Sequence, residues 1–229
     1  MSSLLDKINS RGYWRVVIRP QPFIEKRISQ ITELYPILQN TSVNLRGWDF
    51  PHLDHHIQTH VDMDWIGQES DWEHFLEIWR FYQSGQFIDI TGMDEDWYDQ
   101  RHSIPAALGD WRPGLILGIG NTLFRFTEIF EFAARLAMTQ AGDDIIRVEI
   151  TVINLEGRKL WVDSHSRIPL RHNYIASIRE FPYQIELSRT ELIATPRELA
   201  LKPTIELFRR FHWDPSQDVL RDQQKELRL

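Results

Sequence analysis

Residues 121–140 predict a long helix with apolar side chains on most of its circumference. Asn121 or Thr122 is a suitable N-terminal cap, and Gly142 is a suitable stop signal. A helix that is apolar on most sides is buried in the core of a protein, so the rest of the chain has to cover it. We therefore expect this helix to lie at the centre of the fold.

Two alternating segments predict the strands that cover the helix. Apolar and polar residues alternate over Tyr13–Arg19 and again over Ile146–Val152, which is typical of half-buried strands. A turn at Leu155–Arg158 leads into Leu160–Val162, which predicts a hairpin with the second strand. The expected fold class is α+β, with a mixed or antiparallel sheet packed on the helix. No Gly/Ser-rich or Pro-rich linker divides residues 1–229, so we expect one domain.

Weaker patterns predict the remaining elements. Apolar spacings of three and four over Ile24–Leu38 predict a helix, and Thr41–Arg46 and Thr59–Trp65 predict short strands. Helix-start signals at Thr195-Pro196 and Asp214-Pro215 predict a helical C-terminal tail over residues 195–229.

Residues 70–92 fit two different structures. Ser70 and Glu73 form a capping-box pattern in front of a helical stripe of aromatic residues that ends at Gly85. The same segment is rich in strand-forming residues around a Ser84-Gly85 turn, which predicts a hairpin. The sequence leaves both alternatives open.

Charge is distributed very unevenly along the chain. Residues 48–100 contain thirteen acidic residues and one basic residue, Arg80, so this segment carries a net charge of −12. The whole chain carries −7, so the remaining residues together carry +5. The same stretch holds five histidines and five tryptophans. One interpretation is the solvated face of an element whose other face is aromatic. The other is an acidic surface, which repels nucleic-acid phosphates and attracts a basic protein.

Composition excludes several classes of protein and site. With no cysteine in the chain, there is no disulfide framework, thiolate zinc site or cysteine nucleophile. No apolar run approaches the roughly 20 residues of a membrane-spanning helix, and the first residues show no secretory signal. We therefore expect a cytoplasmic protein that does not enter a membrane.

One cluster of residues has the composition of a metal site. Imidazole and carboxylate groups suit zinc or manganese, and two-residue spacing on a strand directs side chains to the same face. The candidate ligands are His52, Asp54, His55, His56, His60, Asp62 and Asp64. The alternative interpretation is a set of surface histidines beside a strand, with no cofactor.

Leu115–Asn121 predicts a strand that runs directly into the N-terminus of the long helix. Exposed amides at such a junction can bind phosphate. A dinucleotide fingerprint would need a third glycine at Leu123, and a phosphate loop would need Gly-Lys-Ser or Gly-Lys-Thr. Both are missing, so we expect a tight turn before a buried helix.

Two segments, Leu45-Arg46-Gly47-Trp48-Asp49-Phe50-Pro51-His52 and Trp79-Arg80-Phe81-Tyr82-Gln83-Ser84-Gly85-Gln86-Phe87, resemble segments of uncharacterised bacterial proteins. The resemblance covers under a tenth of the chain and implies no function.

The sequence contains no complete catalytic set, so the leading expectation is a non-catalytic binding or accessory subunit. Its acidic, Trp-rich segment would bind a basic protein partner or a second copy of the chain. The expected contact residues are Trp48, Asp94, Glu95, Asp96 and Trp97. A metal-dependent hydrolase built on residues 52–64 is one alternative, and a small-molecule or nucleotide sensor is another.

Overall fold

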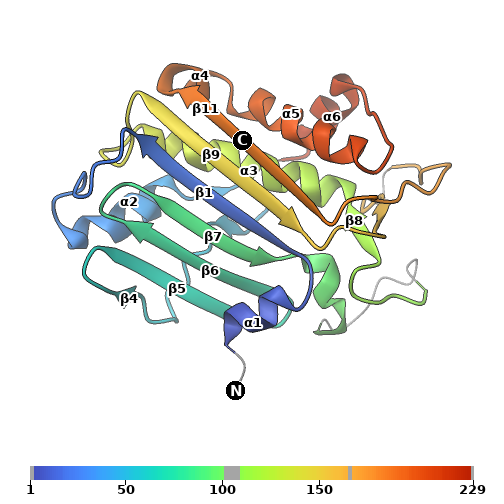
Figure 1. Cartoon of the computed structure of the whole chain (residues 1–229), viewed down its shortest axis with the longest axis horizontal. Helices are drawn as coiled ribbons and strands as arrows, with labels where there is room; N and C mark the ends of the chain where they lie inside the picture. Colours follow the sequence, from blue (N-terminus) through green and yellow to red (C-terminus); the bar gives the residue numbers. More distant parts are fainter. Residues whose placement is uncertain (1–2, 101–108, 165–166, 228–229) are drawn as a thin grey trace.

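The computed structural model describes residues 3–100, 109–164 and 167–227 (Figure 1). Its elements in chain order are α1 (Leu4–Asn9), β1 (Tyr13–Gln21), η1 (Ile31–Glu33), α2 (Leu34–Thr41), β2 (Val43–Asn44), β3 (Asp49–Phe50), β4 (His60–Val61), β5 (Trp65–Trp72), β6 (Phe75–Tyr82), β7 (Phe87–Gly92), η2 (Asp94–Gln100), β8 (Ile116–Gly118), α3 (Ile119–Ala137), β9 (Ile145–Ile153), β10 (Lys159–Trp161), β11 (Glu180–Ser188), α4 (Arg189–Ala194), α5 (Pro196–Arg209) and α6 (Gln217–Gln224).

The main sheet is antiparallel and confirms the predicted α+β fold. Within the described residues it has seven strands in the order β11-β9-β1-β7-β6-β5-β4. β1, the third strand in this order, pairs with β7 on one side and β9 on the other, with Val16 opposite both Asp89 and Ile150. Apolar residues alternate along β1 and β9, so one face of the sheet is buried.

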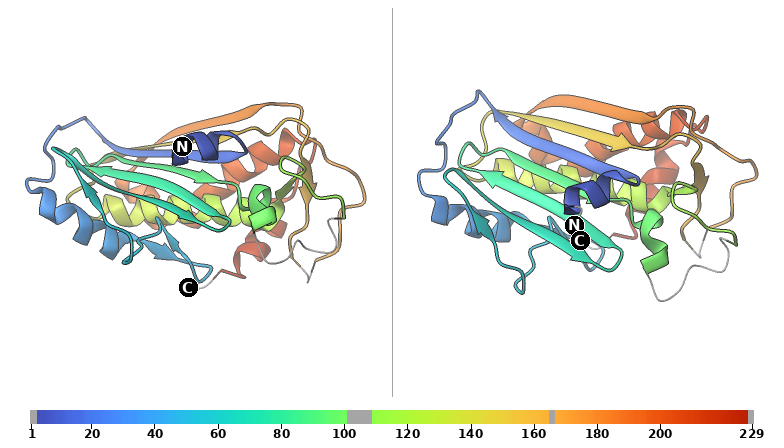
Figure 2. Two further views of the ribbon diagram at one scale, coloured as in Figure 1. Left: turned by 90° about the horizontal axis from the view of Figure 1, so that it is seen from below. Right: turned by 60° about the horizontal axis from the view of Figure 1, so that its bottom comes forward.

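The helices α3, α4, α5 and α6 gather on one face of the sheet, as Figures 1 and 2 show. α3 lies against this face, and the Trp14 ring meets the Phe126 ring edge-on at 5.1 Å between centroids. The predicted central helix is therefore confirmed as the core of the fold.

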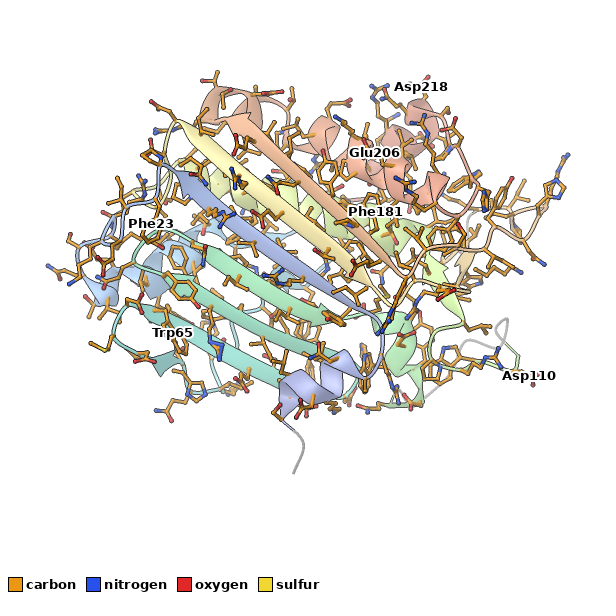
Figure 3. All side chains as sticks on the ribbon, viewed as in Figure 1. Phe23, Trp65, Asp110, Phe181, Glu206 and Asp218 are labelled. Carbon is orange, nitrogen blue, oxygen red and sulfur yellow. The ribbon has the colours of Figure 1, made fainter. Side chains whose placement is uncertain are left out.

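The opposite face of the sheet is only partly covered. α1 packs on it through Ile8, which joins Leu76, Ile78 and Trp97 in a second apolar cluster. Elsewhere this face carries charged side chains in ion pairs such as Arg19 with Glu149. Figure 3 shows how side chains occupy both faces of the sheet.

The helix predicted over Ile24–Leu38 is shorter than expected. Regular structure begins only at Ile31, with η1, and continues through α2. Pro36 explains the start, because it falls in the first turn of α2, where its missing N–H breaks no helical hydrogen bond. A helix beginning at Ile24 would have placed this proline in its interior.

The hairpin predicted from β9 to β10 is wrong. The turn is present, with Asn154 and Gly157 at positive φ, but β10 leaves the main sheet and pairs with β8 in parallel. β9 is instead flanked by β1 and β11. Pairing with strands distant in sequence has replaced the local partner.

Residues 70–92 adopt the strand alternative. β5, β6 and β7 form two successive hairpins, and Gly85 takes φ +83° in the turn between β6 and β7. The predicted strands at 41–46 and 59–65 are much shorter than expected: β2 and β4 have two residues each.

The C-terminal helices are confirmed, and they pack against α3 rather than standing apart. Pro196 occupies the first turn of α5 as predicted, while α6 begins two residues after Pro215, with Ser216 as its cap. The buried Gln224 amide donates to the Thr127 hydroxyl of α3 at 2.9 Å.

Candidate functional site

A cleft of about 450 Å³ opens where η2 faces the N-terminus of α3. Each of the two elements follows a strand: η2 comes after β7, and α3 comes directly after β8. The cleft is lined by Arg46, Asp94, Tyr98, Gly120, Asn121, Phe124, Asp163, Ser164, Gln223 and Glu226.

Carboxylates of the protein itself occupy the amides at the α3 N-terminus. Asp163 accepts hydrogen bonds from the backbone N–H groups of Gly120 at 2.8 Å and Asn121 at 2.7 Å, and Glu95 accepts from that of Gly118 at 2.9 Å. The positive end of a helix dipole favours such anions. These amides already donate to side chains of the protein, which agrees with the absence of a phosphate-loop motif in the sequence.

The two glycines in Gly118-Ile119-Gly120 allow this close approach. A Cβ atom on Gly118 would lie 2.6 Å from oxygens of both Asp163 and Glu95. A Cβ atom on Gly120 would lie 2.8 Å from the side-chain nitrogen of Gln223. The Gly-x-Gly pattern thus accommodates internal acidic side chains, not a nucleotide.

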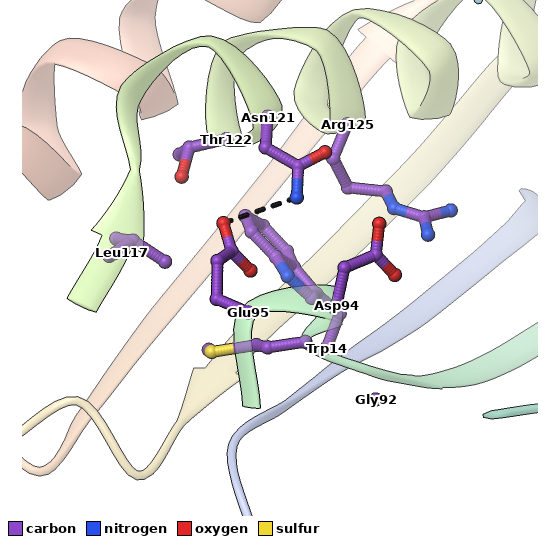
Figure 4. A pocket seen from close by; sticks show the side chains of 9 residues that line it. Trp14, Gly92, Asp94, Glu95, Leu117, Asn121, Thr122 and Arg125 are labelled. Atoms are coloured by element: carbon purple, nitrogen blue, oxygen red, sulfur yellow. Dashed lines mark hydrogen bonds between the residues drawn. The ribbon is translucent and has the colours of Figure 1, made fainter. Parts of the chain in front are cut away.

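Asp94 is the unpartnered acid of the cleft. Its half-buried carboxylate makes no hydrogen bond or ion pair with any residue that the structure describes. It also lines an inner cavity of about 10 Å³, in which its carboxylate points toward the Arg125 guanidinium (Figure 4). The buried hydroxyl of Thr122 lines the same cavity and finds no partner among the described residues. The inner cavity therefore contains one buried hydroxyl without a hydrogen-bond partner, beside the Asp94 and Arg125 side chains.

Glu95, the next residue, is buried and titrates near neutrality. Burial is the main cause that raises its pKa to about 7, and the adjacent Asp94 charge adds to the shift. Hydrogen bonds from Gly118 and from the Asn121 side chain, the latter at 3.1 Å, oppose the shift (Figure 4). Glu95 can therefore exchange a proton at physiological pH.

Arg46 forms the opposite wall and is held firmly. It makes a bidentate ion pair with the buried Glu128 of α3, with both N–O distances 2.8 Å, and donates to the Asn121 side-chain oxygen. The Glu128 carboxylate overcomes the effect of burial and raises the Arg46 pKa. Asp94 and Glu95 also act electrostatically on Arg46 and raise its pKa further, although neither of these two described acids forms an ion pair with it.

Asp96 anchors the η2 turn from the other side. Its carboxylate pairs with Arg158, and both side chains are 1% exposed. It also accepts backbone hydrogen bonds from Gly12 at 2.7 Å and Gly114 at 2.8 Å. A buried carboxylate with a guanidinium and two amides is fully satisfied. Asp96 therefore fixes the turn that presents Asp94 and Glu95.

The five predicted contact residues do not form one exposed surface. Glu95, Asp96 and Trp97 are only 3%, 1% and 2% exposed, while Trp48 and Asp94 are half-buried. The expected contact surface must be corrected for Glu95, Asp96 and Trp97, because they pack against or bond to residues distant in sequence and are buried. Of the thirteen acids in residues 48–100, Glu77, Asp89, Glu95 and Asp96 are buried.

Glu77 of β6 and Asp89 of β7 form a buried carboxyl pair. Glu77 accepts from the His52 backbone N–H at 3.1 Å, and Asp89 accepts from the Thr91 hydroxyl at 2.7 Å. Their remaining oxygens are buried without a donor among the described residues. Burial raises the pKa of both groups, and each also perturbs the other. One proton shared between them satisfies both free oxygens.

The seven candidate metal ligands are spread over a loop and the edge strand β4. His52 stacks on Trp48, His55 lies near the Tyr35 hydroxyl, and Asp54 caps the His56 backbone at 2.7 Å. His60, Asp62 and Asp64 are exposed. No three His, Asp or Glu side chains within the described ranges are arranged to hold a metal ion. The metal-dependent hydrolase stays an expectation from sequence.

Sequence reasoning missed most of the cleft. Asn121 was considered only as a helix cap, and Arg46 only as part of a resemblance. Asp163, Gln223 and Glu226 carried no local signal, since they reach the cleft from segments far along the chain. The Gly118 and Gly120 pattern was the one available indication that something approaches the helix N-terminus closely.

Comparisons with protein families, curated proteins and solved structures give no match. In the part of the chain that the structure describes, no helix combines the length and apolar character needed to cross a membrane.

Proposed function

We propose that this protein is a non-catalytic cytoplasmic binding protein whose acidic cleft holds a positively charged group of a small molecule. The observation that carries the proposal is the Asp94 carboxylate, which lines both the cleft and the inner cavity and makes no hydrogen bond or ion pair with any described residue; it faces the Arg125 guanidinium only across the inner cavity. A half-buried carboxylate gains most from a cation that also donates hydrogen bonds.

The remaining lining supports a cation rather than an anion. Asp163 adds negative charge, whereas Glu226 is paired with Arg167 at 2.9 Å, and the helix amides that would attract phosphate already hold Asp163 and Glu95. Arg46 is committed to Glu128. An acidic cleft repels the phosphates of nucleotides. If the protein is a small-molecule sensor, amines are therefore better candidate ligands than nucleotides.

The cleft also has the size and walls of a small-molecule site. About 450 Å³ lies in the range of ligand pockets, roughly 300–1,000 Å³. Phe124 supplies an aromatic wall, and aromatic faces attract cations. An organic amine with a short apolar body matches this combination.

Isothermal titration with spermidine, choline and ATP tests the proposal on the full chain. We expect spermidine or choline to bind and ATP not to bind. Asp94→Asn should weaken amine binding about ten- to a hundredfold, the worth of a hydrogen bond between charged groups. The control is Asp110→Asn, an exposed acid outside the cleft lining, at the right edge of Figure 3. Equal amine affinity in the Asp94 variant, or a preference for ATP, would contradict the proposal.

A further inference from the structure

Three rings form a stack that ends in solvent at the far end of β5. The Trp48 ring lies parallel to the His52 ring, with centroids 4.3 Å apart, and to the Trp72 ring at 5.3 Å. Trp72 closes the stack and is 54% exposed. The indole at this end of the stack is therefore accessible from solvent.

The surroundings of this stack are acidic. Residues 48–79 contain no lysine or arginine. Glu73 follows Trp72 at the β5–β6 turn, and Asp49 and Asp54 act electrostatically on His52 inside the stack. None of these three acids pairs with a lysine or arginine in the described part of the chain, whereas Asp71 is neutralised by Lys7 at 2.6 Å. The exposed end of the stack therefore lies in a negative field.

The protein itself shows what covers an indole in such surroundings. Arg80 lies over the Trp65 ring at 4.5 Å, and Arg11 lies over the Trp97 ring at 4.0 Å. A guanidinium stacked on an indole gains both a cation–π interaction and dispersion contact. Over Trp72, no lysine or arginine of the described residues takes this position.

We propose that the Trp72 face is a docking site for a basic segment of a partner protein, which stacks an arginine on the Trp72 ring and places its other cations near Asp49 and Glu73. The stack gives the site rigidity, since Trp48 and His52 support the indole from behind. The neighbouring acids favour a basic partner over a second copy, because this surface would repel itself. This site is separate from the cleft and does not depend on the function proposed for it.

Fluorescence anisotropy with a labelled nine-residue peptide of alternating arginine and glycine tests the site. Lysine and glutamate versions of the peptide are the chemical controls. We expect the arginine peptide to bind best, the lysine peptide more weakly and the glutamate peptide not at all. Trp72→Ala should weaken binding about three- to thirtyfold. Asp49→Asn with Glu73→Gln should reduce the salt dependence of binding while leaving the indole in place.

Matched variants separate the site from general effects. Phe23→Ala removes another exposed ring, and Glu25→Gln removes an exposed acid. Both should leave peptide binding unchanged, as should Asp94→Asn, which tests the cleft alone. Unchanged affinity in both the Trp72 variant and the double acid variant overturns the proposal. So does self-association in light scattering that Trp72→Ala abolishes, because the occupant would then be a second copy.

Discussion

The indole nitrogen of Trp79 donates a hydrogen bond of 2.8 Å to the backbone carbonyl oxygen of His52. This bond ties β6 to the segment that ends at His52. The same segment contains Arg46, which lines the cleft, and Trp48, which belongs to the aromatic stack. The bond also joins two segments distant in the chain, Leu45–His52 and Trp79–Phe87. Together with the hydrogen bond from the His52 N–H to Glu77, it holds the segment at His52 on β6.

Trp79→Phe should therefore lower the free energy of unfolding by about 1–3 kcal/mol, because the His52 carbonyl loses its donor in the interior. Urea denaturation measures the change. Trp213→Phe is the control, since its indole nitrogen makes no hydrogen bond with a described residue and only packing is lost. Equal costs for the two variants would show that the hydrogen bond contributes nothing of its own.

The Asp96–Arg158 pair should be far more important for stability than the neighbouring Asp99–Arg11 pair. Asp96→Ala leaves a buried guanidinium without its counter-charge, which costs about 3–5 kcal/mol. Asp99→Ala breaks an exposed pair and should cost at most about 1 kcal/mol. Equilibrium denaturation of both variants gives the comparison. Similar losses would mean that the buried pair does not anchor η2.

Glu95 should make the protein less stable as pH rises. Its pKa is raised from 4.5 in the unfolded chain to about 7 in the folded one. The folded state therefore binds more protons between these values, and the contribution to stability is complete below pH 4.5 and lost by about pH 7. The loss amounts to about 3 kcal/mol.

Glu95→Gln should remove this part of the pH dependence. The free energy of unfolding at pH 5 and pH 8, measured for wild type and variant, isolates it from other groups. Asp99→Asn is the control: the Arg11 hydrogen bond lowers the Asp99 pKa below 3.8, so this carboxylate is charged in both states between pH 5 and pH 8, and its removal should leave the pH dependence in this range unchanged. A Glu95→Gln protein that keeps the wild-type pH profile would refute the assignment.

Gly118→Ala should push the Glu95 and Asp163 carboxylates away from the α3 N-terminus, with a cost of about 1–3 kcal/mol from overpacking. In a double-mutant cycle, Asp163→Ala should relieve part of this cost, since it removes one of the crowded oxygens. Gly157→Ala is the comparison: its φ of +79° makes alanine strained, but its Cβ would meet nothing within 4 Å. Its cost should add to that of Asp163→Ala without coupling. An additive Gly118 cycle would contradict the close approach.

The elements that sequence predicted well are those whose environment follows from local pattern. β1 shows its burial as alternation, and α3 shows its burial as an apolar circumference. The hairpin predicted between β9 and β10 had an equally good local pattern. In the structure, however, β10 pairs with β8, and β9 pairs with β11. Periodicity reveals which side chains are buried without revealing which strand lies beside them.

The site was harder to predict because charge counts assume that acids face water. Asp96 is drawn inside by Arg158, sixty-two residues away, and Glu95 by the amide of Gly118. These partners are set by the packing of β8 and α3 on η2, which no single-segment pattern contains. The other nine of the thirteen acids in residues 48–100 are half-buried or exposed, as the charge count assumes.

The η2 turn sends three consecutive carboxylates to three destinations: Asp94 to the open cleft, Glu95 to the helix amides and Asp96 to a guanidinium on the reverse side. The environment of each acid depends on its position along η2. Deleting a single residue between Met93 and Trp97 would move the remaining acids into their neighbours' environments. This stretch should therefore accept changes of residue type far more readily than changes of length.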